Sequence, residues 1–589
     1  KAYRINPIFI LSCILNRISM KPQQITLFSA SAGSGKTYTL TIEYIKMALS
    51  EVESKGYFRR ILAVTFTIKA AEEMRQRILQ FLAGMADYPT FTYTSSAEQS
   101  KVLAILDKVQ SELAEDGIHL TKEQLAERAG TTLQQILQDY GLFSVMTIDS
   151  FVQRLSASFI DELNLPSQYE VVLDSNGLIH ELINRLLDQV NSTGDAELSE
   201  LILSFANQEI AEGRNWNRMR DSLHGFLKIS LEEKFLAIEP NLSLFQVSDF
   251  LRLEDQLRGL LQQMLQEVKG AAESFIRIID SLGLPDAFYY YGGTGPVGNM
   301  RSFLRNPEIA DKAYANFKKA IEANMWTSAK ATGADKAIIE QHAAELGDLG
   351  SQFIDLQSLY VKRYRFLHWV LKDLKKLALL NLIQREMRVY QQENSAIPIS
   401  EFSKRVYEVI SQDPIPFIYE KLGDRYFHIF IDEFQDTSIL QWKNFMPLVE
   451  NATSVGKRSL LVGDAKQSIY KFRGGEVSLI ASLATQDPSL VADHFAEESL
   501  DEQRFDYLLH QIGPKALNDN YRSAKEVVEF NNQFYHSLVE NESILALCPL
   551  IKPLYGANLK QNPKVASSDF NGKVDLLVYH KSKETFGFT

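Results

Sequence analysis

The sequence predicts an α/β fold with a parallel sheet, a glycine-rich loop at one edge of that sheet, a large inserted helical domain and the start of a second α/β domain. Short apolar runs rich in β-branched residues recur, each followed by small or polar residues, which is typical of buried parallel strands. A glycine-rich loop follows the first run, and a long stretch of helical pattern separates the third run from the fourth.

Five of these runs are predicted as strands: residues 25–29, 61–66, 143–148, 427–431 and 459–462. The helical stretch includes residues 181–190, 251–269 and 356–391. We therefore predict a first α/β domain of residues 20–154 and 423–477, an inserted helical domain of residues 155–422, and the truncated start of a second α/β domain at residues 478–589. In parallel sheets, ligands bind where the loops at the carboxyl ends of the strands gather.

Composition fits a folded protein of several domains, since 45% of the 589 residues are hydrophobic and 23% are charged. The formal net charge of −12 argues against a protein that coats nucleic acid, but it leaves room for a local basic groove. Cys13 and Cys548 form no CxxC motif and no Cys/His cluster, so no disulfide framework or zinc site is expected. A reducing, cytoplasmic compartment fits this cysteine usage.

The chain begins with an apolar run at residues 7–15. This run is too short to span a membrane and is followed by no small-residue cleavage site. We expect Met20 to be the biological start, with residues 1–19 an upstream extension, and we expect no association with a membrane.

The sequence ASAGSGKT at residues 30–37 lies between a predicted strand and a helical pattern, which is the context that the Walker A pattern requires. Gly33 and Gly35 let backbone N–H groups turn toward phosphate oxygens at a helix N-terminus. Lys36 is expected to reach the β- and γ-phosphates of ATP, and Thr37 to hold Mg²⁺. A chance match on a turn of small residues is the alternative. The predicted ATP-binding residues here are Ser29, Ala30, Ser31, Ala32, Gly33, Ser34, Gly35, Lys36 and Thr37.

Two acids, Asp432 and Glu433, directly follow the fourth predicted strand. Asp432 is expected to hold Mg²⁺ together with Thr37, and Glu433 to orient or deprotonate the attacking water. An acid pair of this kind could also end a solvated turn. Together with the phosphate loop it favours hydrolysis of ATP, although these residues alone do not exclude a kinase.

The loop after the fifth predicted strand combines an amide with aromatic side chains. Gln467 can sense the γ-phosphate, and Tyr470, Phe472 and Arg473 follow within a few residues. Aromatic faces and a cation suit single-stranded DNA, because stacking tolerates any base. Packing of the two rings in the core is the alternative.

Six ordered blocks resemble superfamily I DNA helicases of the UvrD/Rep type, and within them the AddA/RecB type of helicase–nuclease subunit. The blocks are ASAGSGKT (30–37), AVTFTIKAA (63–71), TIDSF (147–151), IDEFQDT (431–437), VGDAKQSIYKFRG (462–474) and NYRS (520–523). The resemblance implies RecA-like P-loop NTPase domains that use ATP and Mg²⁺. It further implies 3′→5′ movement along single-stranded DNA in double-strand-break repair and recombination.

The resemblance also assigns residues to the DNA path and to the nucleotide. It implies that Tyr521 stacks on adenine and that Arg522 stabilises charge on the γ-phosphate, whereas a surface ion pair is the alternative for Arg522. Phe66 is implied to contact a DNA base, unless it belongs to the core. The full DNA set is Thr65, Phe66, Thr147, Ser150, Tyr470, Phe472 and Arg473, and the full catalytic set is Lys36, Asp432, Glu433, Gln467 and Arg522.

The sequence reaches Thr589 before any match to the later family motifs or to a nuclease domain. We therefore expect an N-terminal portion of a bacterial helicase or helicase–nuclease, weakly active alone, which acts on duplex ends with a second, AddB-like subunit. A DNA-binding structural subunit with a vestigial or regulatory ATP site is the main alternative. A transport ATPase is a third, but it predicts a membrane segment.

Overall fold

The computed structural model describes most of the chain in two compact units. It describes residues 24–51, 56–411, 422, 425–555, 560–565 and 572–575. Within these ranges it leaves out residues 164, 167, 173, 193–195, 212, 214–215, 234, 236–238 and 549. One unit falls within Lys1–Leu173 and Ile397–Thr589, and the other within Asp174–Ala396. We call them the α/β unit and the helical unit. The expected extension at residues 1–19 lies outside the described residues.

The α/β unit contains a six-stranded sheet with the strand order β3-β2-β6-β7-β1-β8. All of its strand pairs are parallel. The strands are β1 (Ile25–Ala30), β2 (Ile61–Thr65), β3 (Val145–Thr147), β6 (His428–Ile431), β7 (Ser459–Gly463) and β8 (Ile512–Leu517). The predicted α/β fold class and the five predicted strands are confirmed, whereas β8 was not predicted.

Neighbouring strands of this sheet come from distant parts of the chain. Ile25 of β1 pairs with Ser459 of β7, and Ile61 of β2 pairs with His428 of β6. Because the strands run parallel, the loops that follow them leave from one edge of the sheet. The segments after β1, β2, β3, β6 and β7 therefore meet at that edge.

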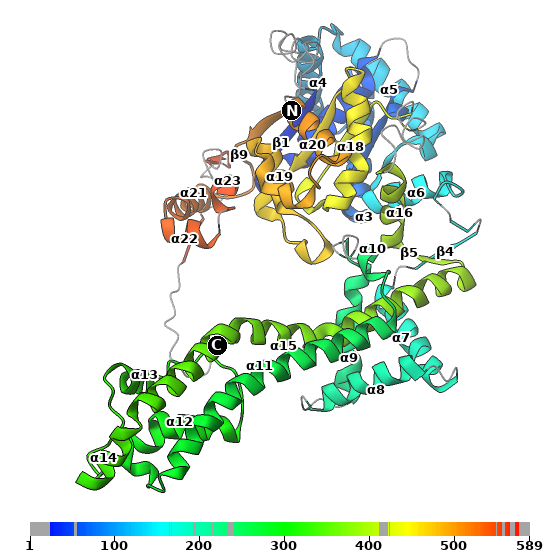
Figure 1. Cartoon of the computed structure of the whole chain (residues 1–589). Helices are drawn as coiled ribbons and strands as arrows, with labels where there is room; N and C mark the ends of the chain where they lie inside the picture. Colours follow the sequence, from blue (N-terminus) through cyan, green and yellow to red (C-terminus); the bar gives the residue numbers. More distant parts are fainter. Residues whose placement is uncertain are drawn as a thin grey trace, which may run out of the picture. The chain divides into compact units, whose positions relative to one another are not determined.

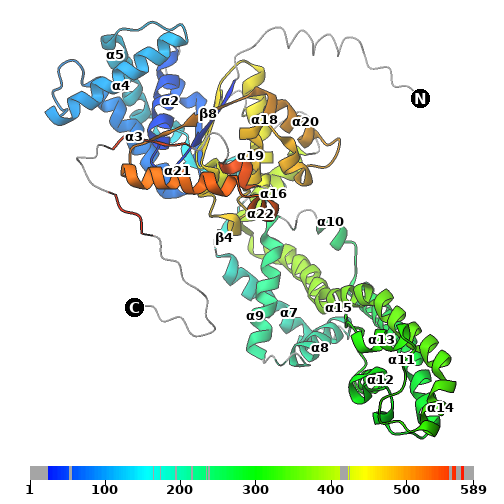
Figure 2. The same cartoon turned by 90° about the vertical axis from the view of Figure 1, so that its left-hand side faces the viewer.

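Helices cover both faces of the sheet (Figures 1 and 2). Successive strand residues face opposite sides: Ile61 and Ala63 of β2 belong to one core, whereas Leu62 and Val64 belong to the other. This burial on both faces explains why the strands read as continuous apolar runs. The first face carries α2 (Lys36–Ser50), α3 (Ile68–Ala86), α4 (Ser96–Glu115) and α5 (Lys122–Gln138), and the second carries α6 (Ile148–Ser158), α16 (Ile399–Ile410), α18 (Ile439–Ser454), α19 (Val477–Thr485) and α20 (Leu500–Gln511).

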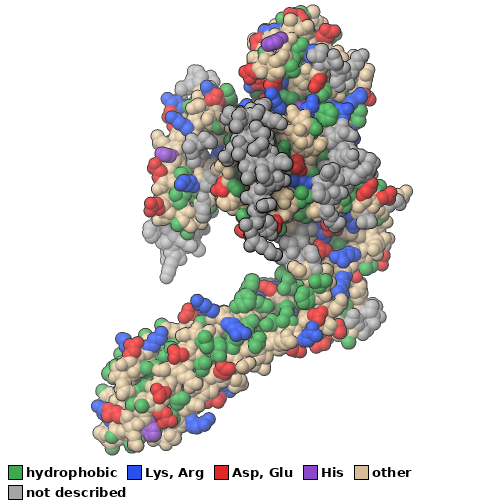
Figure 3. Space-filling view, turned by 45° about the horizontal axis from the view of Figure 1, so that its top comes forward, with side chains coloured by type: hydrophobic (Ala, Val, Ile, Leu, Met, Phe, Trp, Pro, Cys, Tyr) green, Lys and Arg blue, Asp and Glu red, His purple; other side chains and the backbone are tan. Residues whose placement is uncertain are grey.

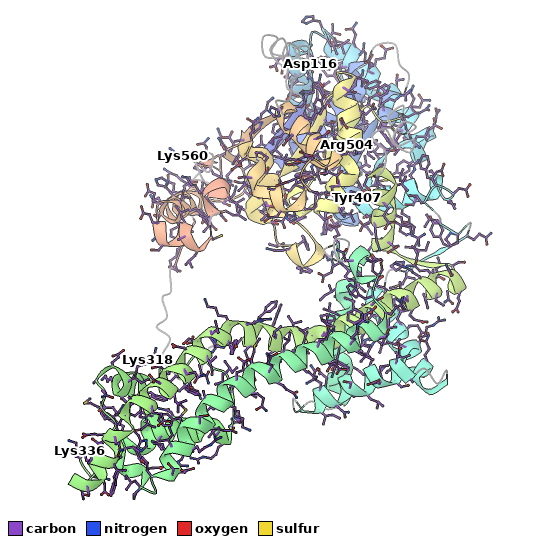
Figure 4. The ribbon with its side chains drawn as sticks, viewed as in Figure 1. Asp116, Lys318, Lys336, Tyr407, Arg504 and Lys560 are labelled. Atoms are coloured by element: carbon purple, nitrogen blue, oxygen red, sulfur yellow. The ribbon has the colours of Figure 1, made fainter. Side chains whose placement is uncertain are left out.

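Polar contacts join three helices of the second face. Arg504 of α20 is buried, and its Nε lies 3.1 Å from Glu450 Oε2 on α18. The hydroxyl of Tyr407 on α16 donates to Asp501 Oδ2 on α20 at 2.7 Å. Figure 4 labels Arg504 and Tyr407 on these helices. The segment after β7 is thereby fastened to the same layer as α16 and α18.

The helical unit is built around two long antiparallel helices, α11 (Val247–Ser281) and α15 (Ala343–Asn394). Lys375 Nζ lies 3.3 Å from Glu254 Oε1, and the Tyr360 hydroxyl donates to Glu267 at the other end of the pair. Figure 3 shows hydrophobic side chains gathered along this unit. Its other helices are α7 (Ser175–Ser192), α8 (Ala196–Ala211), α9 (Trp216–Leu227), α10 (Glu239–Leu242), α12 (Pro296–Arg305), α13 (Ala315–Glu322) and α14 (Gly333–Gln341).

The observed units differ from the predicted domain limits in two places. The helical unit is shorter than residues 155–422, because Phe159, Leu163 and helix α16 pack in the core of the α/β unit. Strand β8 lies beside β1 in the first sheet, although residues 478–589 were predicted as the start of a second α/β domain. The remaining elements are β4 (Glu170–Val172) paired with β5 (Ala396–Pro398), β9 (Asp519–Asn520) paired with β10 (Asn562–Pro563), α21 (Lys525–Val539), α22 (Glu542–Leu547) and α23 (Ile551–Tyr555).

Within the part of the chain that the structure describes, no helix combines the length and the apolar character needed to cross a membrane.

Candidate functional site

The phosphate loop connects β1, which ends at Ala30, to α2, which begins at Lys36. Gly33 and Gly35 have φ angles of +78° and +83°, a left-handed conformation that glycine adopts without steric cost. No side chain caps the N-terminus of α2, so its first N–H groups remain available to an anion. The loop therefore has the backbone of a phosphate-binding turn.

Lys36 contacts two of the other predicted catalytic residues. Its Nζ lies 3.1 Å from Glu433 Oε2 and donates to Gln467 Oε1 at 3.3 Å. Lys36 follows β1, Glu433 follows β6 and Gln467 follows β7. The parallel sheet thus brings together side chains from three separate segments of the chain.

Asp432 is the more deeply placed of the two strand-end acids. It is 4% exposed, and Oδ1 accepts the backbone N–H of Glu433 at 2.9 Å. Burial raises the pKa of Asp432 to about 7, and the charge of Glu433 adds to this rise. Glu433 has a φ of +50°, a strained conformation that costs about 1–3 kcal/mol.

The donor set fits Mg²⁺ and a bound phosphate. A buried carboxylate whose charge is disfavoured gains from a nearby cation, and Thr37 supplies a hydroxyl at the start of α2. No group of three or more His, Cys, Asp and Glu side chains forms a metal site among the described residues. Ser34 Oγ is buried without a hydrogen-bond partner in the described structure, and a phosphate oxygen would satisfy it.

The block with Tyr521 and Arg522 lies against the phosphate loop. The backbone N–H of Tyr521 donates to the Gly33 carbonyl at 2.9 Å, and Asn520 Nδ2 donates to the Ala32 carbonyl at 3.2 Å. A Cβ on Gly33 would lie 2.6 Å from Cβ of Arg522, so glycine is needed for this approach. Tyr521 is 62% exposed, and the Arg522 guanidinium has no ion pair among the described residues. The alternative of a surface ion pair is therefore not observed for Arg522.

Four predicted DNA-binding residues form one group, which we call the aromatic cluster: Phe66, Tyr470, Phe472 and Arg473. The ring centroids of Phe66 and Tyr470 are 5.0 Å apart, and those of Tyr470 and Phe472 are 5.8 Å apart. The guanidinium of Arg473 lies 5.6–6.0 Å from all three ring centroids. Phe472 is 76% exposed, so core packing does not explain its position.

The other predicted DNA contacts are less accessible. Thr65 is fully buried at the end of β2, and Thr147 is 7% exposed. Thr147 caps α6, because its hydroxyl accepts the backbone N–H of Ser150 at 3.1 Å. Ser150 is exposed. Of these three residues, Thr65 and Thr147 are therefore buried, and Ser150 is exposed.

Sequence reasoning assigned no role to Asp464 or Gln435. Asp464 is 3% exposed, and its Oδ2 accepts from Gln467 Nε2 at 2.6 Å. Its position directly after β7, equivalent to that of Asp432 after β6, is a signal that could have identified it. Gln435 bonds to Glu433 and Asp436, and burial, assisted by Glu433, raises the pKa of Asp436 to about 6.

A Walker A loop at the edge of a parallel sheet, with strand-end acids beside its lysine, defines the α/β unit as a P-loop NTPase fold of the RecA-like type. A family model described as the UvrD/REP helicase N-terminal domain matches residues 14–488, and the chain belongs to this family.

Curated relatives support the same assignment. The chain is 24% identical over 579 residues to an ATP-dependent helicase/nuclease subunit of Streptococcus pneumoniae (strain Hungary19A-6), in a match that covers 94% of this chain and 41% of the relative. It is 23% identical over 587 residues to a protein of the same name from Lactococcus lactis subsp. cremoris (strain SK11), covering 95% and 42%. The chain therefore spans about two fifths of the length of these relatives. The expected resemblance to UvrD/Rep helicases and to helicase–nuclease subunits is confirmed.

Proposed function

We propose that this chain carries the ATP-binding part of an ATP-dependent DNA helicase or translocase. The activity is 3′→5′ movement along single-stranded DNA, from duplex ends, in double-strand-break repair and recombination. One arrangement supports it most: Lys36 contacts both Glu433 and Gln467, and the loop that carries Gln467 also carries most of the aromatic cluster. A hydrolysis site and a base-stacking surface therefore share one loop.

The phosphate side of the site has four residues with distinct roles. Lys36 neutralises the β- and γ-phosphates at the N-terminus of α2. Thr37 and Asp432 would hold Mg²⁺, which when bound offsets charge on the phosphates. Glu433 orients the attacking water and accepts its proton. The ion pair between Lys36 Nζ and Glu433 Oε2, at 3.1 Å, breaks when the ammonium group moves to a phosphate.

The remaining residues link the nucleotide to DNA. Gln467 responds to the γ-phosphate, and Tyr521 stacks on the adenine. Arg522, which is exposed and lies beside the phosphate loop, stabilises charge on the γ-phosphate. The aromatic cluster stacks on successive bases, which contributes about 1–3 kcal/mol per base and tolerates any sequence.

The names of the relatives support a partner. Both relatives are named as one subunit of a helicase/nuclease, which implies a second subunit. We propose an AddB-like partner and a nuclease activity in the complete assembly. A DNA substrate implies work in the bacterial cytoplasm.

The test is ATP hydrolysis by the full-length protein with and without single-stranded DNA. We expect stimulation by DNA and a loss of at least about 100-fold in Lys36→Ala and Glu433→Gln, because each removes a group that acts on the reacting phosphate or water. Lys101→Ala changes an exposed lysine of α4 and serves as the control. Equal hydrolysis with and without DNA contradicts a motor. DNA binding without hydrolysis supports a structural role instead.

A further inference from the structure

Gln435 lies inside the candidate site but has none of the roles given above. Gln435 is 1% exposed and lies two residues after Glu433. It belongs to a short 3-10 turn, η7 (Phe434–Asp436). Its Nε2 donates to Glu433 Oε2 at 2.6 Å and to Asp436 Oδ2 at 3.3 Å. Its Oε1 accepts the backbone N–H of Asp464 at 2.8 Å. Every polar atom of the amide therefore has a partner.

These contacts determine the orientation of the amide. A backbone N–H only donates and ionised carboxylates only accept, so Oε1 must face Asp464 and Nε2 must face the two acids. Gly463 makes room for this arrangement, because a Cβ there would lie 2.8 Å from Gln435 Oε1. A buried amide in a single orientation is a rigid spacer between the groups at its two ends.

The two ends belong to different functional segments. One end holds Glu433, whose Oε2 also lies 3.1 Å from Lys36 Nζ. The other end holds Asp464, which bonds to Gln467 at the start of the 464–473 loop. The backbone carbonyl of Gln435 also accepts from Ser468 Oγ, at 3.2 Å. Gln435 therefore fastens the segment after β6 to the loop of the aromatic cluster.

A second link between these segments runs from Glu433 through Lys36 to Gln467. It uses the ammonium group that we assign to the phosphates, so nucleotide binding would redirect it. The link through Gln435 does not use Lys36: its central contacts are the Gln435 amide and the backbone N–H of Asp464, to which we assign no contact with the nucleotide. It can persist through a cycle of hydrolysis.

We propose that Gln435 is a positioning residue that holds the Glu433 carboxylate and couples it to the 464–473 loop, so that DNA on the aromatic cluster sets the rate of hydrolysis. This inference rests on the proposed function. Without the Nε2 hydrogens, Glu433 and Asp436 lose the donor that lies between them. Without Oε1, the loop loses its attachment at the backbone N–H of Asp464.

The first test is Gln435→Met in the full-length protein, which keeps the length of the side chain and removes its polar atoms. We expect the DNA-stimulated kcat to fall roughly tenfold or more while KM for ATP changes less than about threefold. Gln357→Met is the matched control, because Gln357 is 3% exposed in the helical unit and its Oε1 likewise accepts a backbone N–H, from Ala310 at 3.1 Å. This control should keep the stimulation by DNA.

The second test is Gln435→Glu, measured as a pH series. The charged and titratable groups around this position are Lys36, Glu433, Asp436 and Asp464. Near pH 8 the new carboxylate repels the acids, whereas near pH 6 it takes up a proton and can donate as the amide does. We expect activity relative to the wild type to recover about tenfold toward the lower pH.

Wild-type stimulation and KM in both variants would overturn the inference. If Gln435→Met does not fold, the pH series of Gln435→Glu decides: recovery at low pH supports coupling, whereas a profile parallel to the wild type, or loss at every pH, overturns it. A wild-type protein that DNA does not stimulate would instead overturn the proposed function, so the two failures are distinguishable.

Discussion

His428 begins β6 as a buried, neutral histidine. Its Nδ1 lies 2.8 Å from the carbonyl oxygen of Arg458, and its Nε2 lies 3.0 Å from the hydroxyl of Tyr57. A carbonyl only accepts, so Nδ1 carries the hydrogen and Nε2 accepts from Tyr57. Burial lowers the pKa of His428 to about 4, although the hydrogen bond to Arg458 works in the opposite direction.

We expect this histidine to make the α/β unit less stable as the pH falls from about 6.5 to about 4. The unfolded chain takes up a proton in this range and the folded ring does not, so stability is lost toward low pH, by about 2 kcal/mol between pH 7 and pH 5. In urea unfolding, His428→Asn should remove most of this loss. His119→Asn, at an exposed histidine between α4 and α5, is the control. An unchanged pH dependence in His428→Asn would contradict the assignment.

Single residues differ in how far the sequence predicts them. Asp432 was predictable because a charged side chain directly after a strand must emerge at the ligand-binding edge. Lys36 was predictable because the Walker A pattern places a lysine at the start of the helix that follows the loop. The aromatic side chains of Tyr470 and Phe472 could likewise be identified from the sequence as candidates for stacking on bases. Gln435 was not predictable, since the direction of a side chain in a 3-10 turn depends on contacts with the next strand, and no periodic pattern encodes them.

At the scale of elements, β8 shows what limits prediction. Its sequence, IGPKAL, contains glycine, proline and lysine, which are depleted in strands. Among the strands that the structure describes, it lies at the end of the sheet order and pairs with β1 alone. An edge strand tolerates Pro514 because one side of its backbone needs no partner in the sheet. The strands inside the sheet were predictable because burial on two faces demands apolar residues.

Helix α5 depends on its N-terminal cap. The hydroxyl of Thr121 accepts the backbone N–H of Gln124, and the Gln124 side chain accepts the backbone N–H of Thr121. We expect Thr121→Ala to destabilise the α/β unit by about 1 kcal/mol in denaturant unfolding. Thr131 is the matched control, because it is exposed in the same helix and its hydroxyl donates to the Glu127 carbonyl within the helix instead of capping its end. An equal cost for Thr131→Ala would show that capping is not the cause.

At the scale of the whole molecule, the sequence indicated an inserted helical region but not its limits. Helices α6 and α16 carry an apolar face, as the helices of the insertion do. Their pattern does not say whether that face meets the sheet or another helix. The structure answers this through Phe159, directly after α6, and Phe402 of α16, which are buried in the core beneath the sheet.

Two compact units should respond differently to nucleotide. We expect a non-hydrolysable ATP analogue with Mg²⁺, at 100 times its Kd, to stabilise the α/β unit by about 2.7 kcal/mol and to leave the unfolding of the helical unit unchanged. Scanning calorimetry measures both transitions. Lys36→Ala should abolish the shift. A shift that persists in Lys36→Ala would place the nucleotide elsewhere.

The strand order also determines when the sheet can form during synthesis on the ribosome. Both neighbours of β1 are made late, because Ile25 pairs with Ser459 and Ile512. At about 5–20 residues per second, β1 waits on the order of 20–90 s for its first partner. The helical unit, which is continuous in sequence, is complete before that. Throughout this interval the apolar segment ITLFSA has no partner strand and needs protection from aggregation. We therefore expect synthesis of this chain to depend on chaperones, although the segment is buried once the sheet is complete.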